Sequence, residues 1–352
     1  MTMFRRGTAS AMVGRGDSLV PQMAAYRDLS DPAEVPWLPY VMYFHRRDCR
    51  SPVVNTDRLG FRLTSWRDSV ISPATAHTAA ASVRVLAGSS TVFGVGATGD
   101  GACISSRLST PEEESPWLNF GGRGYSATQE LLLFLLNRHL LPPVRDIVIM
   151  SGANDLILTG LKSSLDSEYG SFFSCGEYYA TMEEAKPRHR NGRGTRRSSR
   201  HLSARPPVTT AGDEPDRSAE DRVRRTTEQI ARNLDNWLPL ADASGARLSY
   251  VLQPVASWIR DRPPWEEQLL FDDSNRRNAF EQRLFEAVEH QSAGKMLSDA
   301  IAEECGKRDI RLIDMNEKMK SSIGPDQWVF IDRVHLNDDG YRTVSQIMTD
   351  AM

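Results

Sequence analysis

The sequence predicts an α/β protein whose parallel β-sheet is covered by helices on both faces. Four short runs of β-branched and aliphatic residues have the pattern of buried strands, at 83–87, 146–150, 247–254 and 310–315. Amphipathic stretches with helical spacing separate these runs. Strands that alternate with helices favour crossover connections and therefore a parallel sheet.

The helical stretches are predicted from capping residues and from apolar spacing. Ser126 and Gln129 fit a capping box, which predicts a helix that runs to about Leu140. In 219–241 the apolar residues fall on one face at 3.6-residue spacing. Further helices are expected around 280–288, over 296–304 and from about Asn337 to the C-terminus.

Two segments differ in composition from the main domain, which is predicted to span 83–352. Residues 1–82 are rich in proline with short aromatic pieces, and we expect a mostly irregular N-terminal extension that packs on that domain. Gly60, in the turn at 55–62, is expected to adopt a backbone conformation that other residues disfavour. The basic run 186–206 has no acidic residue and hardly any apolar one, which predicts a disordered insertion near 180–218.

Composition narrows the class of protein. The chain has 352 residues, 40% of them hydrophobic and 25% charged, which is typical of soluble globular proteins. A formal net charge of -3 argues against nucleic-acid binding by the whole domain. The basic run 186–206 could contact RNA, anionic lipid or an acidic partner, but it has no aromatic residue to stack on a base, and a solvated, variable insertion is favoured.

The chain offers no sign of a membrane segment, of secretion or of a metal site. The N-terminus has no apolar signal core, and no run approaches the ~18 apolar residues of a membrane helix. Four scattered cysteines without CxxC pairing indicate free thiols in a reducing compartment. We therefore expect a cytoplasmic protein without metal or other cofactor, and the sequence leaves its oligomeric state open.

Candidate functional residues follow the predicted strands, where groups of an open parallel sheet gather at one edge. Ser90 lies in Gly88-Ser89-Ser90-Thr91, directly after the strand 83–87. A serine on such a turn suits a nucleophile whose own amide helps to hold an oxyanion. An ordinary turn is the alternative.

Two further segments offer hydrogen-bond donors at the same edge. The glycines of 121–124 free the backbone to approach a ligand just before the helix at 126. Asn154 follows the strand 146–150, and its amide is a neutral donor suited to an oxyanion hole. A plain strand-to-helix loop and a helix cap are the respective alternatives.

Asp332 and His335 lie three residues apart before the last helix. At this spacing a carboxylate can reach Nδ1 of the imidazole and leave Nε2 free to take a proton. The GxGxxG match at 94–99 begins too late after its strand for the tight turn of a dinucleotide site, and no P-loop lysine follows Gly88.

In this order, the four segments resemble the blocks of the SGNH (GDSL-type) hydrolase family from about residue 83 to the C-terminus. The resemblance implies a three-layer α/β/α sandwich with a flavodoxin-like parallel sheet. It also implies Ser90 as nucleophile, Asp332 and His335 as the DxxH pair, and an oxyanion hole made by Ser90, Gly124 and Asn154.

Some features of the sequence point to a narrower group within the family or depart from the family pattern. The segments 55–62, 169–173 and 253–254 look like SGNH-like proteins called inducers of phenazine A, found around bacterial natural-product genes. The Asp that usually precedes the family's nucleophile is replaced by Ser89, which puts the local turn and the substrate range in question.

The resemblance implies an ester hydrolase that acts through an acyl-enzyme on a small acylated metabolite. An acyltransferase would use the same groups if an alcohol or amine intercepted the acyl group. A catalytically silent SGNH-like protein that binds a metabolite or a partner protein is the alternative outside enzymes.

Overall fold

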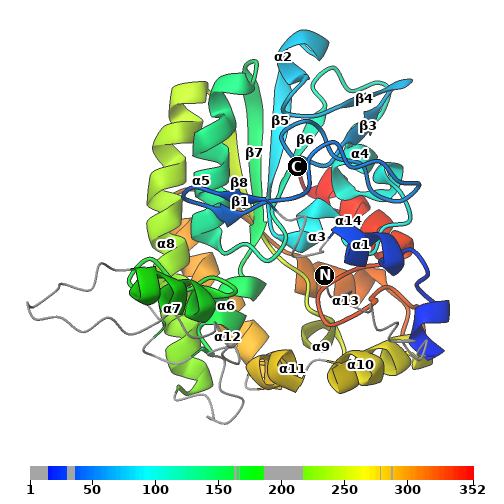
Figure 1. Cartoon of the computed structure of the whole chain (residues 1–352), viewed down its shortest axis with the longest axis vertical. Helices are drawn as coiled ribbons and strands as arrows, with labels where there is room; N and C mark the ends of the chain where they lie inside the picture. The colour runs from blue at the N-terminus through cyan, green and yellow to red at the C-terminus, as the bar shows by residue number, and fades with distance from the viewer. Residues whose placement is uncertain are drawn as a thin grey trace, which may run out of the picture.

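The computed structural model describes residues 15–29, 36–161, 165, 167–185, 217–277, 279–286 and 288–352. Its centre is a five-stranded parallel sheet in the order β6-β5-β7-β8-β9 (Figure 1). The strands are β5 (Val83–Gly88), β6 (Trp117–Gly121), β7 (Val144–Ser151), β8 (Arg247–Leu252) and β9 (Arg311–Asp314). The four predicted strands are confirmed, and β6 is an addition.

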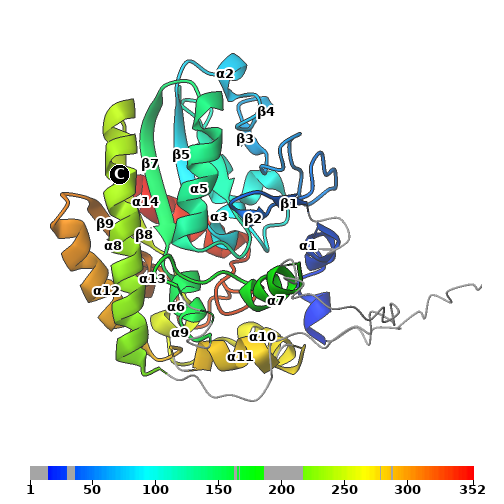
Figure 2. The same cartoon turned by 60° about the vertical axis from the view of Figure 1, so that its left-hand side comes forward.

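Helices cover both faces of the sheet, so the predicted three-layer α/β/α architecture is confirmed (Figures 1 and 2). One face packs on α5 (Ala127–Asn137), α8 (Ala219–Ser244) and α12 (Gln291–Gly306). The other packs on α4 (Ile104–Leu108), α13 (Met315–Ser322) and α14 (Asp338–Ala351). Side chains alternate between the two cores along each strand, as Ile147 and Val148 do in β7.

Strand β6 was not predicted because its sequence lacks a continuous apolar run. All its residues are buried, including Asn119, whose side-chain amide donates to the carbonyl of Val92 at 2.8 Å. At Gly121 an added Cβ would lie 2.2 Å from the backbone nitrogen of Phe93. Close backbone approach and a satisfied polar side chain therefore replace apolar patterning in this strand.

Helices α5, α8 and α14 begin where the sequence predicts, but α12 begins at Gln291, before the predicted start at 296. Helix α5 has the expected capping box, but it ends at Asn137 and a 3₁₀ turn, η3 (Arg138–Leu140), follows. Helix α14 begins after the N-cap Asn337, as predicted. The other helices of the sheet region are α3 (Ser90–Phe93), η2 (Asp100–Ala102), α6 (Ala153–Leu158), α7 (Cys175–Ala185), α9 (Ala256–Ile259), α10 (Trp265–Arg277) and α11 (Ala279–Glu286). Among these, only α11 was predicted.

The region before residue 83 has more regular structure than expected. It contains η1 (Arg15–Ser18), α1 (Met23–Leu29), β1 (Trp37–Leu38), β2 (Met42–Tyr43), β3 (Thr64–Trp66), β4 (Ser69–Ile71) and α2 (Ala76–Ala79). The strands form two antiparallel pairs outside the main sheet. The domain boundary at residue 82 stays a prediction.

The basic run 186–206 lies outside the described residues. The predicted insertion of 180–218 began too early, because residues 180–185 belong to α7. Across the described ranges, no helix has the length and apolarity needed to cross a membrane.

Arg62 is a fully buried cation that joins the N-terminal region to the helix α3. Its guanidinium pairs with Asp100 at 2.9 Å and donates to the hydroxyl of Tyr26 and to the carbonyl of Gly94, both at 2.8 Å. Gly94 ends α3 in a left-handed conformation with a φ of 92°. Arg62 therefore stabilises the end of the short helix that starts at Ser90.

We expect Arg62→Met to lower the free energy of unfolding by about 3–5 kcal/mol, because it removes the cation paired with the partly buried Asp100 carboxylate and leaves buried carbonyls without their donor. Urea denaturation would measure the loss. Arg58→Met, at an exposed arginine in the same turn, is the control and should change stability by less than about 0.5 kcal/mol. Equal stability of the two variants would contradict the structural role of Arg62.

Candidate active site

Three neighbouring strands bring the candidate functional segments to one edge of the sheet. Ser90 follows β5, Gly124 follows β6 and Asn154 follows β7, and β5 lies between the other two strands. Because the strands are parallel, their carboxyl ends meet at this edge. The loop 332–335 reaches the same edge, since the side chain of His335 contacts Ser90.

Ser90, His335 and Asp332 form a continuous hydrogen-bonded chain. The imidazole Nε2 lies 2.7 Å from Ser90 Oγ, and Nδ1 lies 2.6 Å from Asp332 Oδ2. With the Nδ1 proton donated to the carboxylate, Nε2 accepts the hydroxyl proton of Ser90. The residue Ser90 is 8% exposed and the His335 side chain 18%, so the hydrogen bond between them is largely shielded from water.

Asp332 also organises its own turn. Its Oδ1 accepts the backbone N–H groups of Val334 at 3.0 Å and of His335 at 2.8 Å. Burial raises the pKa of this carboxyl, but the interaction with His335 and the two backbone hydrogen bonds outweigh burial and hold the pKa below its usual range. Asp332 is therefore ionised at neutral pH and fixes the orientation of the imidazole.

The turn at 332–335 is closed at its base by backbone pairing. Ile331 N donates to the carbonyl of His335 at 2.9 Å, and Phe330 pairs with Leu336. Asn337 then caps α14 through Gly340 N. The imidazole is thus carried by a short turn that lies between a β-bridge and the N-terminus of α14. The spacing of Asp332 and His335 indicated their interaction but did not reveal this bridge.

Gly124 occupies a position where other residues are strained. Its φ is +69°, and an added Cβ would lie 2.8 Å from the hydroxyl oxygen of Tyr43. The Tyr43 hydroxyl donates to the Gly124 carbonyl at 3.1 Å, and His45 Nε2 accepts the backbone N–H of Arg123 at 3.2 Å. Side chains of the N-terminal region therefore hold this loop, a role that the sequence did not reveal.

Asn154 lies in the first turn of α6 and is buried. Its side-chain amide donates one proton to the carbonyl of Tyr125 at 2.8 Å, directly after Gly124. An amide carries two protons, so one remains for another acceptor. Gly124 and Asn154 are thereby linked to each other, on the strands that flank the one carrying Ser90.

Gln253, at the end of β8, connects the serine turn to the histidine turn, and it was not among the predicted residues. Its Oε1 accepts the hydroxyl of Ser89 at 3.0 Å, and its Nε2 donates to Thr91 Oγ1 at 2.8 Å. The Thr91 hydroxyl donates to the carbonyl of Val334 at 3.1 Å. A buried hydrogen-bond chain thus spans both neighbours of Ser90 and the residue before His335.

Two buried carboxyl groups, those of Glu130 and of Asp155, the residue after Asn154, interact with each other. Asp155 accepts the backbone N–H of Ala127 and the side-chain amide of Gln229, and Ser151 donates to Glu130 at 3.1 Å. Burial raises the pKa of Asp155 to about 7. Burial, and then the nearby charge of Asp155, raise the pKa of Glu130 well above its usual value. Both carboxyl groups therefore keep their protons to a higher pH than exposed carboxyl groups do.

Within the described ranges no group of three or more His, Cys, Asp or Glu side chains is arranged to hold a metal ion.

Comparisons with known proteins gave structural neighbours only. No protein-family model and no curated protein sequence matches the chain. A lipolytic protein of the G-D-S-L family from Veillonella parvula is 13% identical, with 77% of this chain and 98% of that chain covered and a TM-score of 0.41. An extracellular lipase from Streptomyces rimosus is 11% identical, with 78% and 100% covered and a TM-score of 0.44. A carbohydrate acetylesterase from Sinorhizobium meliloti is 13% identical, with 76% and 96% covered and a TM-score of 0.40.

The buried carboxyl pair of Glu130 and Asp155 makes the free energy of unfolding depend on pH. Because both folded-state pKa values are raised, the stabilisation is complete below the usual carboxyl pKa and is lost as pH rises toward and through about 7. We expect the free energy of unfolding to fall by roughly 2–4 kcal/mol between pH 4 and pH 8. Urea denaturation at several pH values measures this loss.

Glu130→Gln imitates the protonated acid, so its stability should fall less over the same pH range. Glu112→Gln, at an exposed carboxylate, is the control and should follow the unmodified chain. Parallel curves for all three proteins would rule out the coupling between Glu130 and Asp155.

Proposed function

We propose that the protein is a serine ester hydrolase of the SGNH type. The observation that carries the proposal is the hydrogen-bonded chain from Ser90 Oγ through the imidazole of His335 to the carboxylate of Asp332. A hydroxyl, a neutral imidazole and an ionised carboxylate in this order are the groups needed to activate a serine for acyl transfer.

In the first half-reaction Ser90 Oγ attacks the ester carbonyl carbon while its proton passes to His335 Nε2. Asp332 stabilises the imidazolium that forms and keeps its ring in place. When the tetrahedral intermediate collapses, the bond to the leaving oxygen breaks and His335 returns the proton to that oxygen. The products of this step are the free alcohol and an acyl-enzyme on Ser90.

In the second half-reaction water takes the place of the alcohol. His335 removes a proton from the water as it attacks the acyl carbon, and the proton then goes to Ser90 Oγ as the carboxylic acid leaves. The balance is ester plus water giving acid plus alcohol. If an alcohol or amine attacks instead of water, the same groups perform acyl transfer.

The proposed oxyanion hole consists of the backbone N–H groups of Ser90 and Gly124 and the side-chain amide of Asn154. Ser90 N belongs to the first turn of α3, where N–H groups have no partner within the helix. Asn154 has one amide proton left after its bond to Tyr125. Donors of this kind each lower the barrier by about 2.7–4 kcal/mol.

We also propose that the substrate is a small acylated metabolite and that the protein is cytoplasmic. A role in bacterial natural-product metabolism, with a relation to inducer of phenazine A-like proteins, is part of the same proposal. A catalytically silent protein with the same fold is the outcome that the following test would reveal.

Ser90→Ala should reduce kcat/KM for p-nitrophenyl acetate by about 10³-fold or more, because the nucleophile is lost while the fold is kept. Release of p-nitrophenol measures the rate, and Ser321→Ala, at an exposed serine on α13, is the control. A fluorophosphonate probe should label Ser90, as mass mapping would show. Folded protein that neither turns over the ester nor reacts with the probe is a binding protein and not an enzyme.

Gln253→Met should lower kcat for the same ester by about tenfold to a hundredfold with little change in KM. The reason is that Gln253 positions the Ser90 and His335 turns and does not touch the substrate. Steady-state kinetics separates kcat from KM, and circular dichroism checks folding. Gln346→Met, at an exposed glutamine on α14, is the control. An unchanged kcat in folded Gln253→Met would show that the chain through Thr91 has no role in positioning.

A further inference from the structure

The turn that carries Gly124 belongs to no helix or strand. The N–H of Tyr125 donates to the carbonyl of Gly122 at 3.1 Å, which closes a β-turn with Arg123 and Gly124 at its centre. Gly124 has a φ of +69° while the φ of Arg123 is not positive, so the turn is of type II. In the described part of the chain the Gly124 N–H makes no hydrogen bond. It is therefore available to an oxyanion, but no regular element fixes its position.

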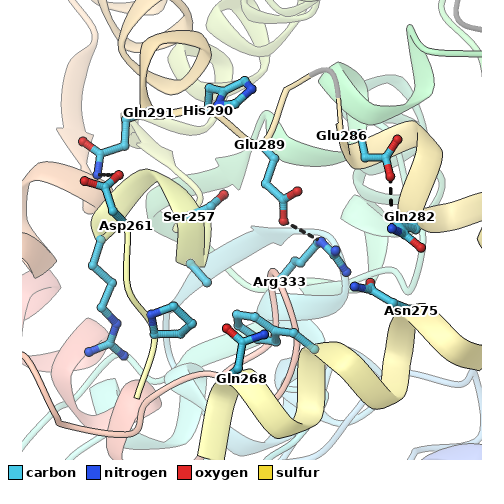
Figure 3. A pocket seen from close by; sticks show the side chains of 14 residues that line it. Ser257, Asp261, Gln268, Asn275, Gln282, Glu286, Glu289, His290, Gln291 and Arg333 are labelled. Atoms are coloured by element: carbon cyan, nitrogen blue, oxygen red, sulfur yellow. Dashed lines mark hydrogen bonds and ion pairs between the residues drawn. The ribbon is translucent and has the colours of Figure 1, made fainter. Parts of the chain in front are cut away.

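The other groups of the proposed site are held by regular elements or by an ion pair. Ser90 and Asn154 belong to the helices α3 and α6. The loop that carries the imidazole is anchored through Arg333, whose guanidinium pairs with Glu289 at 2.9 Å in the wall of a polar pocket (Figure 3). The turn at 122–125 lacks such an anchor of its own, so its position depends on the side chains that contact it.

Two side chains of the N-terminal region contact this turn on either side of the Gly124 N–H. The Tyr43 hydroxyl donates to the Gly124 carbonyl at 3.1 Å. Burial raises the pKa of Tyr43, so the hydroxyl keeps the proton that it donates. His45 Nε2 accepts the N–H of Arg123 at 3.2 Å, while its Nδ1 donates to the carbonyl of Gly60 at 3.0 Å. The peptide groups before and after the one that carries the Gly124 N–H are thus both held.

Tyr43 reaches this position through a strained hairpin, which consists of β1, β2 and the loop between them. Val41 N donates to the carbonyl of Pro39, and Tyr43 N donates to the carbonyl of Val41, both at 2.9 Å. The residues between these partners, Tyr40 and Met42, have φ values of 73° and 72°. A hydrogen bond from residue i to i+2 around such a φ defines the rare, strained form of the γ-turn. Two of these turns in succession persist only where their surroundings hold them.

The surroundings that hold the hairpin are the residues directly after Gly124. The hydroxyl of Tyr125 donates to the carbonyl of Tyr43. The side-chain amide of Gln129 donates to the carbonyl of Val41 at 3.0 Å. The rings of Tyr43 and Tyr125 also pack edge to face, with their centroids 5.7 Å apart. The hairpin and the Gly124 turn therefore hold each other, and the strained backbone is retained where it brings a phenol group to the Gly124 carbonyl.

We propose that Tyr43 is a positioning residue for the reaction, whose hydroxyl holds the Gly124 turn so that the Gly124 N–H lies within reach of the oxyanion. The proposal rests on the proposed ester hydrolysis and extends the site to the region before residue 83. An oxyanion donor acts at about 2.7–3.1 Å, and a misplacement of about 1 Å can cost about a hundredfold in rate. Because the carbonyl oxygen becomes an anion only in the tetrahedral intermediate, Tyr43 acts on kcat more than on KM.

Tyr43→Phe removes the hydroxyl and keeps the ring, and it tests the proposal on the full chain. We expect kcat for p-nitrophenyl acetate to fall by about tenfold to a hundredfold, with KM changed by less than about twofold. Phenylboronic acid gives a second readout, because Ser90 Oγ adds to its boron to form a tetrahedral anion with an oxygen in the place of the oxyanion. Its Ki should rise by about the factor by which kcat falls.

Tyr40→Phe is the matched control, since it makes the same change at an exposed tyrosine of the same hairpin. It should leave kcat, KM and Ki unchanged. If circular dichroism shows that Tyr43→Phe does not fold, Tyr125→Phe takes its place, because it removes the hydrogen bond that holds the Tyr43 backbone. This variant should lower kcat and raise Ki in the same way, by smaller factors.

The outcomes separate the two proposals. Folded Tyr43→Phe with an unchanged kcat, or with a raised KM and an unchanged Ki, would overturn the role of Tyr43 and leave the hydrolase standing. An equal loss in Tyr40→Phe would overturn it as well, because the hydroxyl that contacts Gly124 would then have no effect of its own. Failure of the unmodified chain to hydrolyse the ester, with Ser90 unreactive toward the fluorophosphonate probe, would instead contradict the proposed function itself.

Discussion

The hydrogen bond between Ser90 Oγ and His335 Nε2 joins residues 245 positions apart, and the rest of the site depends on it. Two constraints produce it. The parallel sheet places the turn after β5 at its carboxyl edge, between the ends of β6 and β7. The bridge between Phe330 and Leu336 closes the turn that carries the imidazole. Each turn is fixed by its own surroundings, and the two turns meet because the ends of parallel strands lie at one edge of the sheet.

The N-terminal region completes that edge by fixing two of its loops. Arg62 and Tyr26 bind the end of α3, and Tyr43 and His45 bind the loop at 123–124. Burial lowers the pKa of His45 to about 3, so the ring is neutral and its Nε2 can accept a backbone N–H. Loops at the carboxyl edge of an open sheet are otherwise free to move. The rigidity of this site is therefore shared between the sheet and residues that precede it in the chain.

Sequence patterns predicted those parts of the molecule that are determined by residues close together in the chain. The strand before Ser90 and the spacing of Asp332 and His335 are local, and the structure brings the three side chains together. Strand β6 was not predicted because Asn119 and Gly121 interrupt the apolar pattern, and both are accommodated through contacts with α3. Gln253 was not predicted as a site residue for a related reason, since its partners Ser89 and Thr91 lie far away in the chain.

The resemblance to SGNH hydrolases predicts an Asp at position 89, and the direction of the hydrogen bonds explains why a serine fits there instead. The Ser89 hydroxyl donates to Gln253 Oε1, which turns Nε2 of the same amide toward Thr91. Thr91, having accepted, points its own proton to the carbonyl of Val334. A carboxylate at position 89 accepts only, so it would require Nε2 on its side and leave Oε1 toward Thr91. Thr91 would then have to donate to Oε1 and would release Val334. In this chain a hydroxyl at 89 is thus the group that lets the serine turn hold the histidine turn.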